Sequence, residues 1–310
     1  MSTDNDGPRV FSFLRSFQTP SLALALAGAQ PGGSAAEPPP ADSAPVDKSR
    51  YHLFYPTPPP YLREMNTDRP DKTESPYTVD AGHFQMELDW VNFTRERRKE
   101  GGVTTRTETW AIAPINLKAG LCNSADLQLV LESYTETRNR TQGGGAAGET
   151  TQRGFGDITA RLKYNFWGND GGPTAAGVMA FVKLPTNQDR LGNNSVEGGV
   201  ILPLAVELPL GFGLGLMTEV DFRRTDRRDR YHQEFSNSIT LGHSLVGDLG
   251  CYLEFFSQVS TESGSEWEGS VDLGFTYGLT QNTQFDAGVN IGVTKGAADL
   301  NPFVGFSWRY

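Results

Sequence analysis

The sequence predicts an all-β protein, an antiparallel up-and-down transmembrane β-barrel of about twelve strands with a disordered N-terminal leader. Two observations predict this fold. From Gly82 onward, apolar and polar residues alternate with a period of two, which is typical of strands with one lipid-facing and one water-facing side. The chain also ends in such a strand, since Val304, Phe306, Trp308 and Tyr310 share one side of it. A last strand ending on an aromatic residue is expected where it pairs with the first and closes a barrel.

Two segments precede the alternating region. Residues 1–29 are predicted to be a signal peptide, because Arg9 and Arg15 come before the short apolar run 22–29, which ends in small residues. Residues 30–66 are rich in Pro, Ala and Gly. They predict an extended or disordered linker.

The predicted barrel, residues 82–310, divides into twelve alternating segments, an even number as bacterial barrels require. Each is long enough to cross a bilayer at a tilt of about 45°. Pro114 falls inside the second segment and requires a bulge or an interruption of the pairing. The predicted strands are 82–95, 104–118, 125–138, 154–167, 174–184, 195–208, 212–224, 231–246, 251–262, 267–278, 284–294 and 302–310.

The connections alternate between short and long. Barrels of this class place short turns in the periplasm and long loops outside the cell, so both chain ends are predicted on the periplasmic side. The short turns are 121–124, 209–211, 247–250 and 279–283, and the long polar loops are 96–103, 139–153, 185–194, 224–230 and 294–301.

Composition narrows the function. The net charge of −10 argues against nucleic-acid binding, which needs clustered positive charge. No run reaches the roughly 18 apolar residues of a membrane helix. Cys122 and Cys251 are too few for a disulfide framework and lack metal-ligand spacing, so no metal or cofactor is predicted.

Polar side chains on the inward side of the predicted strands would line the lumen. They form either an acidic pathway that favours neutral or cationic solutes or the ordinary polar filling of a barrel. Both interpretations stay open, since barrels of about eight strands are packed and those of about sixteen are open. The candidate pathway residues are Glu87, Asp89, Arg161, Lys163, Glu219, Asp221, Arg223, Asp272 and Asp286.

Residues 67–81, directly before the barrel, are stiffened by Pro70 and Pro76, which hold the residues before them extended. Two interpretations stay open here too. The segment either docks as a periplasmic plug, with Arg69 and Lys72 at an acid-lined mouth, or is a plain tether to the first strand. The candidate plug residues are Asp68, Arg69, Asp71, Lys72 and Glu74.

No catalytic residues are predicted. A serine hydrolase needs a Ser activated by a His. His243 stands beside Ser244, but neighbours on a strand point to opposite faces. The remaining histidines, His52, His83 and His232, are isolated in the sequence.

The motif TDRPDKTESP at 67–76 resembles the start of the barrel in a family of Gram-negative outer-membrane proteins labelled as transporters of the meta-pathway of phenol degradation. The segments 156–158 and 184–186 are similar as well, and the resemblance extends over 67–310. Lys72 departs from the apolar or aromatic residue expected at its position. The resemblance implies a channel or transporter for small organic solutes, aromatic compounds included, in the bacterial outer membrane.

The expected partners follow from this location. They are the small-molecule solute, outer-membrane lipid, lipopolysaccharide near loop 224–230, and the barrel-assembly machinery, through the strand that ends at Tyr310. Two alternatives remain. The first is a barrel that is an enzyme or purely structural, and the second is a secreted soluble β-sandwich for adhesion or sugar binding, whose strands would also alternate.

Overall fold

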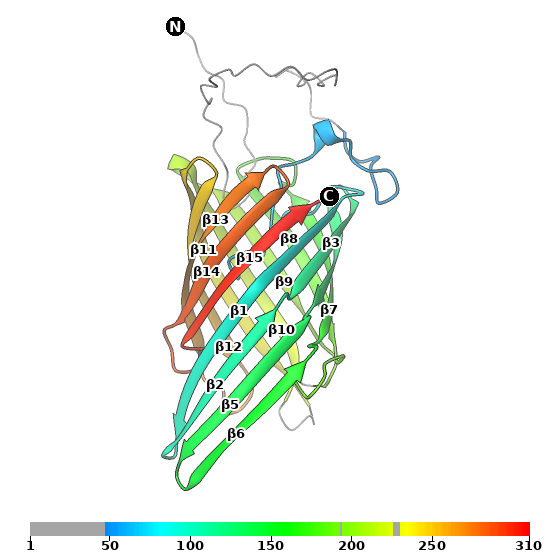
Figure 1. The fold of residues 1–310 in the computed structure, drawn as a ribbon. Helices are drawn as coiled ribbons and strands as arrows, with labels where there is room; N and C mark the ends of the chain where they lie inside the picture. Colours follow the sequence, from blue (N-terminus) through cyan, green and yellow to red (C-terminus); the bar gives the residue numbers. More distant parts are fainter. Residues whose placement is uncertain (1–46, 193, 226–229) are drawn as a thin grey trace, which may run out of the picture.

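The computed structural model describes residues 47–192, 194–225 and 230–310, so the predicted signal peptide lies outside the described part. The described residues form one antiparallel sheet (Figure 1). Its strands are β1 Phe84–Glu100, β2 Val103–Ile112, β3 Ile115–Cys122, β4 Ala125–Leu131, β5 Tyr134–Gly143, β6 Ala146–Gly154, β7 Ile158–Trp167, β8 Thr174–Leu184, β9 Glu197–Glu207, β10 Phe212–Arg224, β11 Tyr231–Val246, β12 Leu249–Ser260, β13 Glu268–Thr280, β14 Thr283–Gly292 and β15 Leu300–Arg309.

Twelve of these strands close into a barrel, which confirms the predicted fold class. Around the ring the order is β1, β3, β4 and then β7 to β15, and β15 pairs with β1 through Met86 opposite Trp308. Phe84 and Tyr310 exchange backbone hydrogen bonds of 3.2 and 2.8 Å at the same junction. Closure leaves the ring without a free strand edge, so its backbone polar groups are paired without water.

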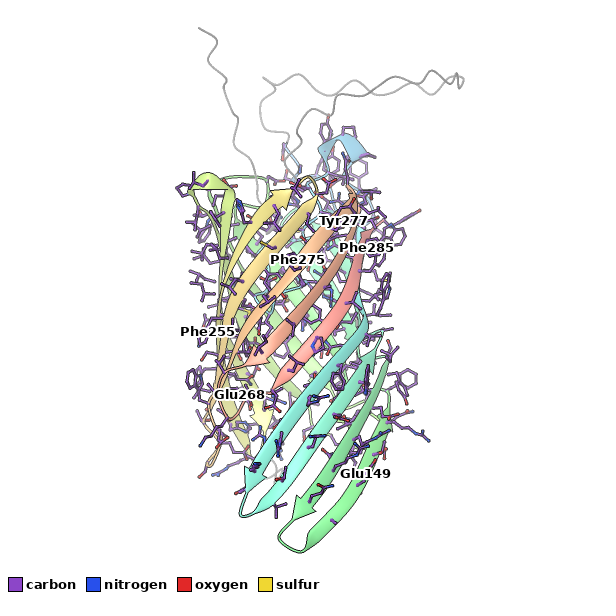
Figure 2. All side chains as sticks on the ribbon, turned by 60° about the vertical axis from the view of Figure 1, so that its left-hand side comes forward. Glu149, Phe255, Glu268, Phe275, Tyr277 and Phe285 are labelled. Atoms are coloured by element: carbon purple, nitrogen blue, oxygen red, sulfur yellow. The ribbon has the colours of Figure 1, made fainter. Side chains whose placement is uncertain are left out.

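The outer surface of the barrel is apolar. On β13, Leu273 is 38% and Phe275 50% exposed, whereas Asp272, directly before Leu273, is 0% exposed. Figure 2 shows Phe255, Phe275 and Phe285 pointing away from the barrel. A closed sheet with its apolar side outward is a membrane barrel, so the alternative of a soluble sandwich is wrong.

The other three strands lengthen one side of the wall. Beyond a bulge between Asp89 and Val91, β1 pairs with β2, β2 pairs with β5, and β5 pairs with β6. Residues 91–100 of β1 together with β2, β5 and β6 are called the extension below. Figure 1 shows the extension projecting from the end of the barrel opposite the C-terminus. That end is called extracellular and the other periplasmic.

Three of the predicted strands are each interrupted once. Segment 104–118 breaks at Ala113 and Pro114, where Ala113 has a φ of 52°. Segment 125–138 breaks after Leu131, and 154–167 breaks after Gly154. The breaks lie side by side in the register, so a single line of interruptions crosses neighbouring strands where the barrel wall gives way to the extension.

Two predicted loops were wrong. Residues 96–103 and 139–153 belong mostly to β1, β5 and β6. Beyond Phe93 and Trp110 the extension projects past the membrane, where both faces of a sheet meet water. Its strands therefore lack the apolar alternation that distinguishes a strand from a loop in sequence.

Residues 47–66, part of the predicted extended or disordered linker, pack on the periplasmic end of the barrel. Tyr51 is 1% exposed, and the backbone N–H of Leu53 donates to Leu121 O at 2.9 Å. Pro59–Tyr61 form a short 3-10 helix, η1, and Pro209–Gly211 form a second, η2. No helix in the described part of the chain is long and apolar enough to cross a membrane.

Candidate functional site

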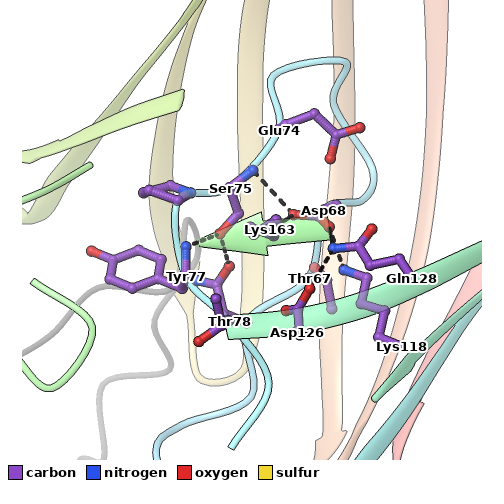
Figure 3. A network of polar contacts seen from close by, with 12 residues as sticks. Thr67, Asp68, Glu74, Ser75, Tyr77, Thr78, Lys118, Asp126, Gln128 and Lys163 are labelled. Atoms are coloured by element: carbon purple, nitrogen blue, oxygen red, sulfur yellow. Dashed lines mark hydrogen bonds and ion pairs between the residues drawn. The ribbon is translucent and has the colours of Figure 1, made fainter. Parts of the chain in front are cut away.

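Residues 66–79, called the luminal segment below, lie inside the barrel (Figure 3). Their sequence alternates acidic and basic side chains with prolines, which hold the chain extended and aim successive charges in different directions. Each of these directions meets a different part of the barrel wall.

Asp68 meets the wall formed by β3, β4 and β7. Its carboxylate contacts the ammonium groups of Lys118 and Lys163 at 2.5 Å each and accepts a hydrogen bond from Gln128 at 3.3 Å. Lys118 also pairs with Glu87 of β1. Lys163 is 0% exposed. A buried ammonium group needs a counter-ion, and Asp68 supplies it from the luminal segment.

Arg69 faces the adjacent part of the wall, formed by β1, β14 and β15. Its guanidinium contacts Asp89 of β1 at 2.6 Å and Asp286 of β14 at 2.7 Å, and lies 5.6 Å from the ring centre of Phe303 on β15. A Cβ at Gly305 would lie only 2.1 Å from this guanidinium. Glycine at 305 therefore provides the room that Arg69 occupies.

Lys72 and Thr73 bind a third part of the wall. Both of their backbone N–H groups donate to the Glu254 carboxylate of β12, at 2.9 and 2.8 Å. The Lys72 ammonium lies 3.1 Å from Asp272 of β13, and the Thr73 hydroxyl lies 2.6 Å from that of Ser238 on β11.

The next residues of the luminal segment contact strands β7 to β10. Glu74 pairs with Arg161 at 2.7 Å, and its backbone N–H lies 3.3 Å from the sulfur of Met217 on β10. Tyr77 packs against Ala175 of β8 and Ala205 of β9. With these contacts, the luminal segment reaches all twelve strands of the ring.

Four of the five candidate plug residues thus have charged partners on the wall, and Asp71 differs. Among the described residues it has no ion pair, and its Oδ2 atom is buried without a hydrogen-bond partner. Of the candidate pathway residues, Glu87, Asp89, Arg161, Lys163, Asp272 and Asp286 contact the luminal segment.

Glu219, Asp221 and Arg223 lie further along β10, toward the extracellular end. There the charges of the wall pair with one another. Arg223 contacts Glu234 of β11 at 2.9 Å and Glu197 of β9 at 3.8 Å.

An apolar patch on the inner wall was missed by the sequence reasoning. It consists of Met179 and Phe181 on β8, Ile201 on β9, Met217 on β10 and Phe256 on β12. The sequence did contain a signal for this patch, because its residues fall on the same side of their strands as charged lumen residues. Met179 and Phe181, for example, alternate in step with Lys183. An apolar side chain at an inward position of a barrel departs from the usual polar lining.

The periplasmic rim holds the preceding chain in place. Lys48 contacts Asp170 of the β7–β8 turn at 2.8 Å, and Arg63 contacts Asp80 at 3.1 Å. Burial acts to raise the pKa of Asp170, but hydrogen bonds from Lys48 and Asn123 outweigh it and hold this pKa below its ordinary value.

The closed ring, its apolar exterior and its polar interior define a β-barrel of the bacterial outer membrane. The chain belongs to the family described as "Putative MetA-pathway of phenol degradation", whose sequence model matches residues 67–310. The resemblance found at the motif 67–76 is thereby confirmed.

Solved structures resemble this chain at low sequence identity. The COG4313 outer membrane channel from Pseudomonas putida F1 is 12% identical, with a TM-score of 0.50 over 79% of this chain and 100% of that one. The translocator domain of the autotransporter NalP from Neisseria meningitidis is 11% identical, with a TM-score of 0.45 over 73% and 88%. The monoaromatic hydrocarbon channel TodX is 10% identical, with a TM-score of 0.44 over 74% and 90%. No curated protein matches the chain.

Proposed function

We propose that this barrel is an outer-membrane channel for small organic solutes, aromatic compounds included, which the luminal segment closes until it moves. In this proposal the protein lets solutes pass through the membrane and catalyses no reaction. The observation that carries the proposal is that one short segment contacts every strand of the ring, beside an apolar patch on the inner wall.

A plug explains these contacts better than a tether. A tether needs contact only with the first strand, whereas Asp68, Arg69 and Lys72 are each paired with a different part of the wall. These wall residues are buried, and a buried charge is stable only when paired. The buried charges of the wall therefore depend on the luminal segment for their counter-ions, and the charges of the segment depend on the wall.

The way the segment is held also allows it to leave. In the described part of the chain, no backbone–backbone hydrogen bond joins residues 66–76 to a ring strand. The contacts are made through side chains and through single backbone N–H and C=O groups. Release would expose charges to water without breaking the strand pairing of the barrel.

The apolar patch favours an apolar solute as the molecule that the channel carries. Met217 touches the luminal segment at the backbone of Glu74, and the Lys72 ammonium lies 4.5 Å from the ring centre of Phe256. Thioether and phenyl groups provide favourable contacts to aromatic molecules. The family description, which names phenol degradation, points to the same class of solute.

The remaining partner assignments belong to this proposal. The assembly machinery would recognise β15 and the terminal Tyr310, whose side chain is 77% exposed at the periplasmic end. Loop 224–230 would contact lipopolysaccharide, although residues 226–229 lie outside the described part.

Solute uptake into liposomes tests the proposal. Full-length protein and a variant with residues 67–76 replaced by a Gly/Ser linker of equal length are reconstituted, and phenol entry is compared with that of a sugar of similar size. We expect the linker variant to admit phenol faster than wild type, with a smaller gain for the sugar. Equal and negligible entry for both proteins, with both folded by unheated gel mobility, would favour the structural barrel instead.

A further inference from the structure

The extension has two chemically different faces, because residues directly opposite each other on paired strands share a face. The face that continues the lumen carries hydroxyl and amide groups, with Thr107 donating to Asn139 at 2.7 Å. The other face continues the lipid-facing surface. It begins with Phe93 opposite Trp110, whose ring centres are 4.5 Å apart.

Beyond this aromatic pair the outer face is mainly basic. Its three carboxylates, Glu108, Glu136 and Glu149, are each paired with an arginine, at 3.8, 3.2 and 3.1 Å. They therefore cannot neutralise the rest of the surface. The basic residues of this face are Arg95, Arg97, Lys99, Arg106, Arg138, Arg140 and Arg153.

Three arginines form a row across adjacent strands. Arg97 of β1 is directly opposite Arg106 of β2, which is directly opposite Arg140 of β5. Glu149 pairs with Arg140, but within the described chain Arg97 and Arg106 have no ion pair and both are exposed. Like charges directly opposite each other destabilise a sheet, so an anion bound between these arginines would stabilise the row.

We propose that Arg97 and Arg106 bind phosphate groups of lipopolysaccharide. Phe93 and Trp110 belong at the boundary between hydrocarbon and head groups. Arg97 lies four residues beyond Phe93, which is about 14 Å along the strand and about 10 Å of height at a tilt of about 45°. That is the level of the phosphorylated head groups of this lipid. Paired guanidinium groups bind phosphate oxygens in a bidentate manner. The inference rests on the outer-membrane location and not on solute transport.

Binding of rough lipopolysaccharide to the purified full-length protein tests the site, with native mass spectrometry as the readout. The double variant Arg97→Gln/Arg106→Gln should bind about 30-fold more weakly, since each basic residue near an anionic surface contributes about fivefold. The control Arg190→Gln/Lys295→Gln removes the same charge from two exposed positions elsewhere and should bind as wild type does.

Two further arms identify the chemistry. Dephosphorylated lipopolysaccharide should bind wild type as weakly as the intact lipid binds the double variant. Arg97→Lys/Arg106→Lys, which keeps the charge, should retain most of the affinity. Equal affinity of wild type and the double variant for the intact lipid would overturn the proposal, as would undiminished binding of the dephosphorylated lipid or no binding to any protein.

Discussion

In the periplasmic half of the lumen, the charges of the wall are balanced by charges of the luminal segment. Lys163 is 0% exposed and has Asp68 as its partner, and Asp286 of β14 has Arg69. The pair between Lys118 and Glu87 is an exception, since both residues belong to the wall. Without the segment, most of these charges would lose their partners.

In the extracellular half, the wall balances itself. Lys183 pairs with Glu197 at 2.6 Å, and Arg223 pairs with Glu234. Arg223 is also wetter than the charges of the periplasmic half, since its side chain is 38% exposed. The two halves therefore use the same residue types for different purposes. One half binds a segment of its own chain, and the other presents a self-neutralised lining to water and solute.

The largest expected effect comes from removing the counter-ion in the periplasmic half. Asp68→Ala leaves Lys163 buried without its partner and Lys118 with Glu87 alone, and breaking such a buried pair costs about 3 to 5 kcal/mol. We expect this cost to displace the luminal segment and to raise the single-channel conductance in planar bilayers. Asp71→Asn, which changes a charge of the same segment that has no ion pair, should leave the conductance near that of wild type.

A matched change in the other half sharpens this comparison. Arg223→Gln removes a partly exposed pair, which contributes about 1 kcal/mol or less. It should leave the channel as closed as wild type. The distinction between the two halves would be lost if Arg223→Gln raised the conductance as much as Asp68→Ala.

A smaller effect is expected at the apolar patch. Phe181→Ala removes one aromatic contact, worth about 0.5 to 1.5 kcal/mol. Block of the ion current by phenol in the Asp68→Ala background should then need about a two- to tenfold higher concentration. Phe255→Ala, which removes a lipid-facing ring of β12, is the control. An equal loss of block in both variants would show that the patch does not bind the solute.

The barrel could be predicted from the sequence because the side of the strand on which a residue lies depends only on its position along that strand. Alternation along each strand, as at Asp272 and Leu273, reports directly which side meets lipid. The hairpin of β5 and β6 could not be predicted in this way, because water on both faces removes the alternation. Its threonines, which favour strands, were the remaining signal.

The candidate site could be predicted only in part. Alternation placed Glu87, Lys163 and Asp286 on the inward side, and the charge pattern of residues 67–76 suggested a plug. Which wall residue meets which segment residue depends on the tilt and register of the closed ring, as the pairing of Asp68 with Lys163 shows. Phe181 was missed because an inward position was assumed to be polar.

The smallest expected effect concerns the periplasmic rim, where Lys48 binds Asp170. The pKa of Asp170 is lower in the folded protein than its ordinary value of 3.8, so its stabilising contribution is present above about pH 4 and is lost as the pH falls below that. The side chain is 42% exposed, and solvent screening limits the contribution to well under 1 kcal/mol. Hydrogen exchange of residues 47–66 should therefore be slightly faster in Asp170→Asn than in wild type at pH 7, and the two proteins should exchange alike at pH 3. Comparing both proteins at each pH cancels the intrinsic pH dependence of exchange. A difference that persisted unchanged at pH 3 would mean that Asp170 holds the rim through shape or neutral hydrogen bonding rather than through its charge.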